Sequence, residues 1–377
     1  MAGVLRRIQR GGIHPSIKGE VWEFLLGCFD PNSTSEERNE LRERRREQYA
    51  AWKSECQKIV PVIGSGKFIT TPIISDDGGP IEESSNPSFP SDVMREVPIN
   101  DGDTDKKLIQ WKLVLHQIGL DVVRTDRSLV FYESEANQAK LWDVLAVYAW
   151  VDNDIGYVQG MNDICSPMII LLENEADAFW CFERSMRRLR ENFRSTTTSL
   201  GVQSQLSTLG QVIKAIDPKL HQHLEELDGG EYLFAIRMLM VLFRREFSFI
   251  DALYLWEVMW AMEYNPNTYM IYEEPRDSSS ASLKNGDIKM NYKQLKQYGK
   301  FERKNVKTGG IEQKSALAVF LVAGVLEAKN KKLLKEAKGL DDVVQILGEL
   351  TGNLDAKKAL KEALKVHSKY LSKAKKL

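Results

Sequence analysis

The chain has 377 residues, 43% hydrophobic and 28% charged, and its 52 basic and 53 acidic side chains give a formal net charge of −1. This composition is typical of a soluble globular protein. It lacks the basic excess that general nucleic-acid binding requires, so no nucleic-acid partner is expected. The longest uncharged apolar run, residues 316–326, is shorter than the roughly 18 residues that indicate a membrane helix. Four cysteines without paired spacing fit a reducing compartment, which predicts a cytoplasmic protein.

The first third of the chain alternates between predicted helices and turn-forming residues. Residues 13–27 predict a turn followed by an amphipathic helix, because apolar residues there recur at helical spacing. A long charged helix is expected over 36–59, where arginine and glutamate alternate as on a solvated face with internal ion pairs. Residues 61–105 are rich in Gly, Pro, Ser and Asp and predict a mobile surface loop.

The rest of the chain predicts helices almost throughout. Val, Ile and Thr never gather into the alternating runs that strands need, so no sheet is expected. Two of the predicted helices are apolar nearly all round, as central core helices are. A second polar stretch, residues 265–312, reads as an insertion and contains Ser278 to Ser280. The predicted helices cover residues 176–191, 205–215, 219–227, 232–243, 250–261, 315–329, 341–351 and 355–373, with the two apolar ones at 232–243 and 250–261.

The pattern predicts an all-α fold class, a large single helical domain with long polar loop insertions. Residues 1–264, with the loop 61–105, form its main part, and the insertion 265–312 precedes the closing helices in 313–373. A metal site is not predicted, since His221 and His223 are two apart and point to different faces of a helix. Neither Gly-x-Ser-x-Gly nor a Cys/His signature for nucleophilic catalysis is present. The chain therefore predicts no active site or cofactor of its own.

Two short segments, residues 118–125 and 156–163, carry polar side chains within apolar surroundings. Asp121 and Arg124 are three residues apart, so on a helical turn the carboxylate lies beside the guanidinium and can hold its rotamer. Such a pair is usually structural, and Tyr, Gln and Asn at a loop-to-helix junction are more often caps than catalysts. The residue types alone leave structural and functional interpretations open.

The order of these segments resembles the motifs of the TBC domain, the GTPase-activating module for Rab-family small GTPases. Ile118, Asp121 and Arg124 match the family pattern Ile-x-x-Asp-x-x-Arg. The pattern Tyr-x-Gln-Gly-Met-Asn is matched by Tyr157, Gln159, Gly160, Met161 and Asn162. Residues 12–27, with Trp22 in the expected place, match the first family motif, but Lys18 stands where the family usually has Arg. Lysine keeps the charge and loses the planar fork.

The resemblance implies a GTPase-activating protein that regulates vesicle traffic. An arginine supplied in trans accelerates GTP hydrolysis by ~10³–10⁵, or roughly 4–7 kcal/mol of barrier. Carried over by motif, Arg124 would be the arginine finger, Gln159 would position the attacking water and Asp121 would orient Arg124. GTP and Mg²⁺ are expected on the partner. Site-shaping or partner contacts are implied for Lys18, Tyr157, Gly160, Met161, Asn162 and Asp163, and structural roles for Trp22 and Ile118.

Alternatives remain at this point. The chain could be a non-catalytic GTPase-binding or adaptor module, or a helical scaffold with accidental motif matches. The lysines that end the chain, from Lys365 to Lys376, could favour an anionic membrane surface. They equally suit a solvated terminal helix whose cations complement its dipole. Transient contact with endomembranes, through the partner or this basic end, is one expectation that follows.

Overall fold

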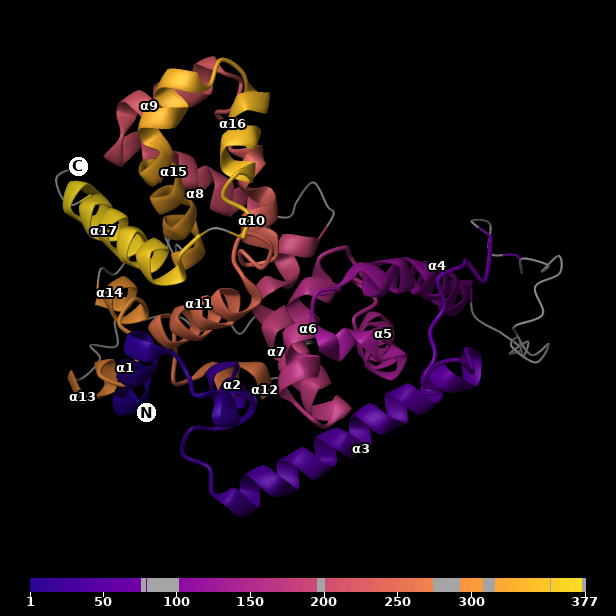
Figure 1. Cartoon of the computed structure of the whole chain (residues 1–377). Helices are drawn as coiled ribbons and strands as arrows, with labels where there is room; N and C mark the ends of the chain where they lie inside the picture. The colour runs from indigo at the N-terminus through magenta and orange to yellow at the C-terminus, as the bar shows by residue number, and fades with distance from the viewer. Residues whose placement is uncertain are drawn as a thin grey trace. The chain divides into compact units, whose positions relative to one another are not determined.

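The computed structural model describes residues 1–75, 79, 102–194, 201–273, 292–307, 316–352 and 354–374. Regular structure in these ranges is helical, without a strand, which confirms the predicted all-α class (Figure 1). No helix in them is long and apolar enough to cross a bilayer. The chain divides into two compact units, residues 32–186 and a terminal unit made of residues 1–31 and 187–377.

The 32–186 unit is built around α5 (Glu135–Val151), whose residues from Leu141 to Ala149 are all buried. Such burial requires neighbours on every side of the helix. Helices α3, α4 and α6 and the short η2 pack against it. Their bounds are α3 Ser35–Ile59, α4 Gly102–Arg124, η2 Val130–Glu133 and α6 Met161–Leu171, and α7 (Glu175–Phe193) begins in this unit.

Capping and buried charge place the long helix α3. The side chain of Thr34 accepts from the backbone N–H of Glu37 and Glu37 returns the bond, so the helix starts with a capping box. Further along, the Lys53 ammonium lies 2.8 Å from Asp143 and 2.5 Å from Glu175. These two carboxylates belong to α5 and α7, so one lysine joins three helices of the 32–186 unit.

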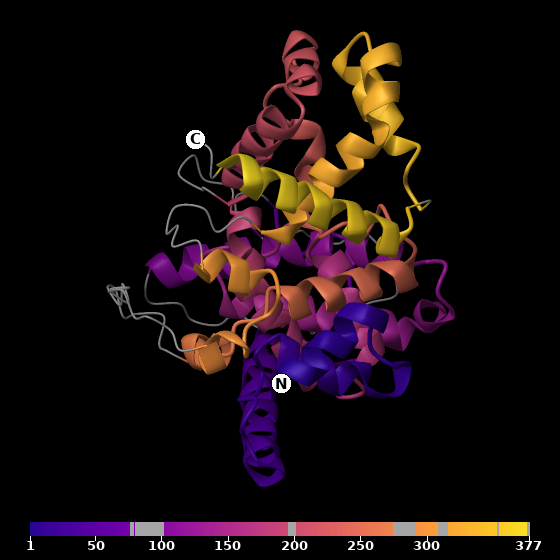
Figure 2. The same ribbon diagram turned by 90° about the vertical axis from the view of Figure 1, so that its left-hand side faces the viewer.

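The terminal unit is centred on the buried first half of one helix, α15 (Leu317–Glu336). Every residue of α15 from Leu317 to Leu326 is buried, and α17 (Ala356–Ala374) packs against it and against α8 (Gly201–Ile216). Figure 2 shows α17 as the yellow helix on the viewer's side of this unit. Helix α11 (Phe249–Met262) packs with α1 (Ala2–Gly11), α2 (Lys18–Leu25) and α17. The remaining elements are η1 Pro15–Ile17, α9 Pro218–Glu226, η3 Leu233–Ala235, α10 Ile236–Met240, α12 Thr268–Glu273, α13 Tyr292–Leu295, α14 Glu302–Lys307 and α16 Leu340–Gly348.

One predicted helix is wrong. Residues 232–243 do not form a single helix: Tyr232 has φ 57°, α10 ends at Met240, and Leu242 and Phe243 have φ of 47° and 59°. The sharp turn presents the carbonyl of Leu242 to the indole N–H of Trp256 at 2.7 Å. A segment that is apolar all round gives no periodic signal for where its helix stops.

Smaller differences occur at the polar stretches. The described parts of 265–312 contain α12, α13 and α14, and α4 begins at Gly102, within the predicted loop 61–105. Most of that loop and Ser278 to Ser280 lie outside the described residues. The helix α1 was not predicted, because Leu5 and Ile8 are its only buried residues.

Candidate functional site

Arg124, the last residue of α4, has an exposed side chain that is bonded to the buried carboxylate of Asp121. Its guanidinium Nη2 donates to Oδ1 of Asp121, one helical turn earlier, as their spacing predicts. The side chain of Arg124 is 59% exposed, whereas that of Asp121 is 5% exposed. A buried carboxylate that accepts a guanidinium N–H restrains the arginine's rotamer while leaving much of its charge in contact with solvent.

A second segment supports the same carboxylate. The hydroxyl of Tyr157 donates to Oδ2 of Asp121 at 2.5 Å, across 36 positions of sequence. Burial, and after it the negative charge of Asp121, raise the pKa of Tyr157 well above its ordinary value. The phenol therefore stays protonated and remains a donor to Asp121 at physiological pH. The Asp121 carboxylate thus receives hydrogen bonds from Arg124, three residues after it, and from Tyr157, 36 residues after it.

The third support joins α4 to the start of α6. Asn162 donates from Nδ2 to the hydroxyl of Thr125 at 2.9 Å, and Thr125 donates to the carbonyl of Asp121 at 2.6 Å. Asn162 also accepts from the backbone N–H of Gly160 at 3.0 Å. Since Asn162, Thr125 and Asp121 are all buried, these bonds are shielded from competing water.

Gln159 sits in the turn that this network holds. Tyr157, two residues before it, is bonded to Asp121, and Gly160, directly after it, is bonded to Asn162. Gln159 itself is exposed. The segments that carry Arg124 and Gln159 are therefore tied together by one buried network, while the two candidate side chains reach solvent.

Two glycines make these backbone paths possible. Gly160 has φ 105°, a left-handed value that favours glycine, and it is the N-cap residue directly before α6. A Cβ on Gly119, within the motif on α4, would lie 1.7 Å from the backbone oxygen of Ile69. Any side chain at 119 would therefore force the loop at Ile69 away from α4.

The remaining residues of this motif region are mostly inside the protein. Ile118 and Met161 are fully buried, and the Met161 sulfur accepts from the backbone N–H of Val158 at 3.4 Å. Asp163 is half-buried in the first turn of α6. Met161 thus holds the turn before Gln159 through its bond to Val158. Ile118 lies on the buried face of α4.

Lys18 and Trp22 belong to the terminal unit, where both bind one carboxylate. Glu257 of α11, fully buried, accepts from the Lys18 ammonium at 2.5 Å and from the Trp22 indole N–H at 3.1 Å, both at Oε1. Its other oxygen accepts from the backbone N–H of Ile13 at 2.9 Å. The Trp22 ring packs edge-on against Trp260 at 4.9 Å. This burial is what the structural role expected for Trp22 would require. Lys18 supplies a positive charge to Glu257 through a single contact at Oε1.

Sequence reasoning did not single out the apolar side chains beside Arg124. Leu120 and Val123 lie in the last turns of α4, which ends at Arg124, and are 48% and 40% exposed, and Val130, six residues after Arg124 in the chain, is 77% exposed. Exposed large apolar side chains next to an exposed charge are a feature of recognition surfaces. Their signal in the sequence was weak, because apolar residues in a motif segment read equally well as core. Thr125 was also missed, although a hydroxyl at a helix end commonly bonds back to the preceding turn.

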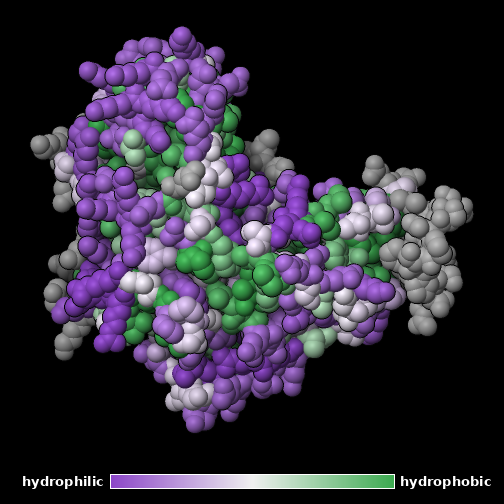
Figure 3. All heavy atoms as spheres, in the orientation of Figure 1, coloured by the Kyte–Doolittle hydropathy of each residue, from purple (hydrophilic) through white to green (hydrophobic). Residues whose placement is uncertain are grey.

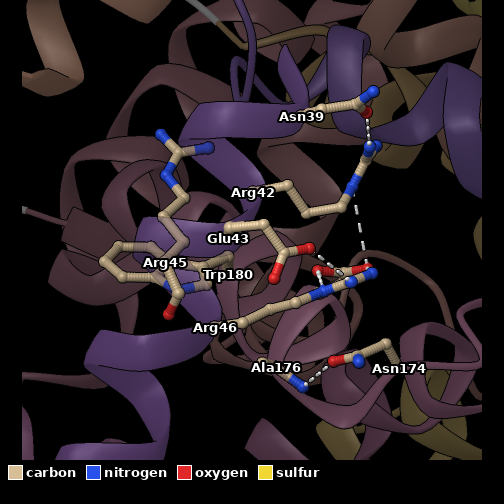
Figure 4. Close-up of polar contacts among 9 residues, drawn as sticks. Asn39, Arg42, Glu43, Arg45, Arg46, Asn174, Ala176 and Trp180 are labelled. Atoms are coloured by element: carbon tan, nitrogen blue, oxygen red, sulfur yellow. Dashed lines mark hydrogen bonds and ion pairs between the residues drawn. The ribbon is translucent and has the colours of Figure 1, made fainter. Parts of the chain in front are cut away.

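The arginines of α3 form a separate polar cluster with α7 (Figure 4). Arg46 donates to both oxygens of Asp177, at 3.1 and 2.7 Å, and to Glu43 at 3.0 Å. Arg45 lies over the ring of Trp180 at 5.2 Å. The ion pairs predicted within α3 are therefore present, and others reach α7. A concavity of about 460 Å³ here is lined by Arg42, Arg46, Glu173, Asn174 and Asp177. Because Arg42 and Arg46 both pair with Asp177, the cluster fastens α3 to α7.

Metal and thiol chemistry find no support in the described part of the chain. No group of three or more His, Cys, Asp or Glu side chains there is placed to hold a metal ion. All four cysteines are buried and are free thiols, not joined in disulfides. Burial raises the pKa of the Cys56 and Cys165 thiols, which keeps them protonated and unreactive.

Known proteins resemble this chain over the range that contains the motif segments. The family model of the Rab-GTPase-TBC domain matches residues 91–272, a range that includes Arg124 and Gln159. Rab GTPase-activating protein 22 of Arabidopsis thaliana is 26% identical over 447 aligned residues, covering 96% of this chain and 75% of the relative. Human TBC1 domain family member 17 is 31% identical over 267 residues, covering 70% of this chain and 35% of the relative. The chain thus spans about a third of the length of the second relative.

A solved structure shares the fold. The crystal structure of the Ypt/Rab-GAP domain of Gyp1p aligns with 99% of this chain and 93% of its own, with a TM-score of 0.62 and 17% sequence identity. The motif residues, the matched family range and the fold lead to the same assignment. This chain belongs to the Rab-GTPase-TBC domain family.

Proposed function

We propose that this chain accelerates GTP hydrolysis on a Rab-family GTPase, with Arg124 as the arginine finger and Gln159 as the residue that positions the water. The observation that carries the proposal is the shared buried network that holds two exposed side chains of these types. An arginine already restrained by Asp121 loses less rotamer freedom when it reaches the partner's phosphates. Its fixed positive charge then stabilises the negative charge that develops on the γ-phosphate oxygens.

Gln159, the second finger, acts on the attacking water. The attacking water must be held in line with the bond that breaks, and a glutamine can do this because its amide both accepts and donates. The turn fixed by Tyr157 and Gly160 presents Gln159 from a segment tied to the base of Arg124. In this proposal, GTP and Mg²⁺ are bound by the partner, and the chain contributes only these two groups to the reacting atoms.

The partner would dock on the surface beside the fingers. Leu120 and Val123 supply exposed apolar area on the helix that carries Arg124, and Val130 supplies more in the segment that follows it. Burying them on association would provide affinity that does not depend on the transition state. In this proposal the protein acts in the cytoplasm and meets its GTPase at endomembranes.

The test is phosphate release from a panel of GTP-loaded Rab proteins, with wild type, Arg124→Ala, Arg124→Lys and Gln159→Ala side by side. Arg124→Ala should lose about 10³-fold or more of the acceleration, because the charge is supplied only in the transition state. Arg124→Lys should recover little of it, since a point charge cannot span two phosphate oxygens. Gln159→Ala should also be strongly impaired while the fold stays intact.

Binding separates this activity from a non-catalytic module. Affinity for the GTP-bound partner should fall much less than the acceleration in each finger variant, because the docking surface is unchanged. Equal activity of wild type and Arg124→Ala would refute the finger assignment. Tight binding to one member of the panel without acceleration by wild type would support an adaptor instead.

A further inference from the structure

Helix α17 presents a face of lysines to solvent. Lys357, Lys358, Lys361, Lys365, Lys369 and Lys373 are all exposed, whereas the residues buried on the same helix are apolar apart from His367. At 3.6 residues per turn the six lysines fall within an arc of about 160°. In Figure 3 the surface over α17 is predominantly hydrophilic.

Acidic groups offset only part of the charge on this face, and Glu327 of α15 interacts electrostatically with Lys369 and Lys373. Lys365 pairs with Glu362 at 2.7 Å, and Glu362 is the only acidic residue of the helix. Lys373 donates to the carbonyl of Ala215 at 2.7 Å. In the part of the chain that the structure describes, Lys358 and Lys361 have no ion pair. The helix therefore carries a net charge of +5 in a chain whose net charge is −1.

The buried side of α17 is already occupied. It packs against α15, α8 and α11, and Phe320 of α15 lies 4.6 Å from His367 between ring centres. No large apolar side chain of α17 is exposed. The helix cannot insert an apolar face into a bilayer without leaving this core, and it lacks the exposed aromatic or apolar anchors typical of protein-binding hot spots.

We propose that α17 adsorbs the chain onto an anionic phospholipid surface, through charge alone and without insertion. Lysine suits this contact because its ammonium is a hydrated point charge on a flexible stem that needs no shaped site. From Lys357 to Lys373 a straight helix extends its charges over about 24 Å, a length that a flat surface of negative headgroups can match. The proposal does not depend on the GTPase-activating function, so its test uses no GTPase.

The test is co-sedimentation of the full chain with vesicles of phosphatidylcholine, alone or with about a third phosphatidylserine. Wild type should bind only the anionic vesicles, and raising the salt concentration should release it, because the Debye length shortens. The triple variant Lys358→Gln, Lys361→Gln and Lys369→Gln should lose binding by roughly tenfold or more. Its melting temperature should match wild type, since all three side chains are exposed.

A matched control removes the same charge elsewhere. Lys58→Gln, Lys67→Gln and Lys140→Gln change three exposed lysines of the 32–186 unit. This variant should retain binding within about twofold of wild type if the contact is localised to α17. An equal loss in both triple variants would overturn the proposal in favour of a general charge effect. Failure of wild type to bind anionic vesicles at low salt would overturn it too, as would binding to heparin without binding to vesicles.

Discussion

Tyr157 connects the two candidate fingers without being one of them. Its hydroxyl is bonded to Asp121, which in turn holds Arg124, and its chain position is two residues before Gln159. Tyr157 is buried, so it cannot itself reach the partner's phosphates. At the scale of single residues, the site separates groups that reach the partner from groups that position them.

Tyr157→Phe should therefore weaken catalysis through positioning. Removing the hydroxyl takes one donor from a buried carboxylate, an effect of about 1–1.5 kcal/mol, which corresponds to roughly tenfold in rate if it falls on the transition state. We expect stimulated hydrolysis at saturating protein to fall by about that factor, with little change in affinity for the GTP-bound partner. Single-turnover phosphate release over a range of protein concentrations measures the two separately.

Tyr148→Phe is the matched control for this change. Tyr148 is also buried in the 32–186 unit, and its hydroxyl donates to Oδ2 of Asp152 at 2.9 Å. Both variants lose a buried hydroxyl bonded to a carboxylate, so both should lower the melting temperature. Only Tyr157→Phe should lower the acceleration measured on folded protein. An equal loss of acceleration in the two variants would assign Tyr157 a purely structural role.

At the scale of elements, charge patterns and turn-forming residues predicted the helices more closely than apolar runs did. The range 36–59 agrees closely with α3, because Thr34 and turn-formers before it mark its start and Val60-Pro61 marks its end. The range 355–373 agrees with α17, because lysines alternate there with apolar residues at helical spacing. In 232–243 no polar residue marks the break, and the turn at Leu242 depends on a hydrogen bond from Trp256 that the local sequence does not indicate.

The candidate site was predictable only in part, for a related reason. The pairing of Asp121 with Arg124 follows from helical spacing. The bonds from Tyr157 to Asp121 and from Asn162 to Thr125 join residues 36 and 37 positions apart. No periodicity in one sequence predicts such contacts, because they arise from the packing of α4 against α6. Asp121, Tyr157 and Asn162 were indicated by the family motifs, and Thr125 was not.

Helix α17 also carries a buried titratable group. The ring of His367 lies between Phe301 and Phe320, at 4.5 and 4.6 Å between ring centres, and is 2% exposed. Burial, with a smaller contribution from the charge of Lys304, lowers the pKa of His367 to about 4 from its ordinary 6.5. Its Nδ1 atom has no hydrogen-bond partner among the described residues.

This burial predicts a loss of stability in mild acid. Between pH 6.5 and about 4 the unfolded chain binds a proton at His367 that the folded chain does not, so the free energy of unfolding falls as pH falls through this window. His367→Phe should remove that component, because a phenyl ring suits the aromatic surroundings and cannot titrate. Chemical unfolding at pH 7 and pH 5 measures it as the difference between variant and wild type.

The control for this titration is an exposed histidine. His14→Gln alters a side chain at the surface, bonded only to Ser16 in the described structure. It should lose as much stability between pH 7 and pH 5 as wild type does. A His367→Phe variant with the same pH dependence as wild type would show that carboxylates elsewhere account for the acid sensitivity.

At the scale of the whole molecule, the candidate fingers and the first family motif lie in different units. The network around Arg124 and Gln159 lies entirely within residues 32–186. The first family motif, with Lys18 and Trp22, lies in the terminal unit and converges on Glu257. In the terminal unit, this motif therefore supplies buried contacts to Glu257.

Lys18→Ala tests this separation. The variant leaves the fully buried Glu257 carboxylate with two neutral donors and no counter-charge, which should cost about 3–5 kcal/mol of stability. Lys18→Arg, which keeps the charge, should recover a large part of it. Acceleration per folded molecule, measured well below the melting temperature, should be unchanged in both, because neither alters the 32–186 unit.

The outcome also decides between two roles for Lys18. As a control for charge removal, Lys332→Ala breaks an exposed pair with Glu349 at 2.5 Å and should leave the melting temperature nearly unchanged. If Lys18→Ala instead melts like wild type but loses acceleration, the ammonium contacts the GTPase, as the family motif implied. If it melts early and accelerates normally, the lysine serves Glu257, and the usual arginine of the motif is replaceable here because the buried carboxylate requires a positive charge and not a fork.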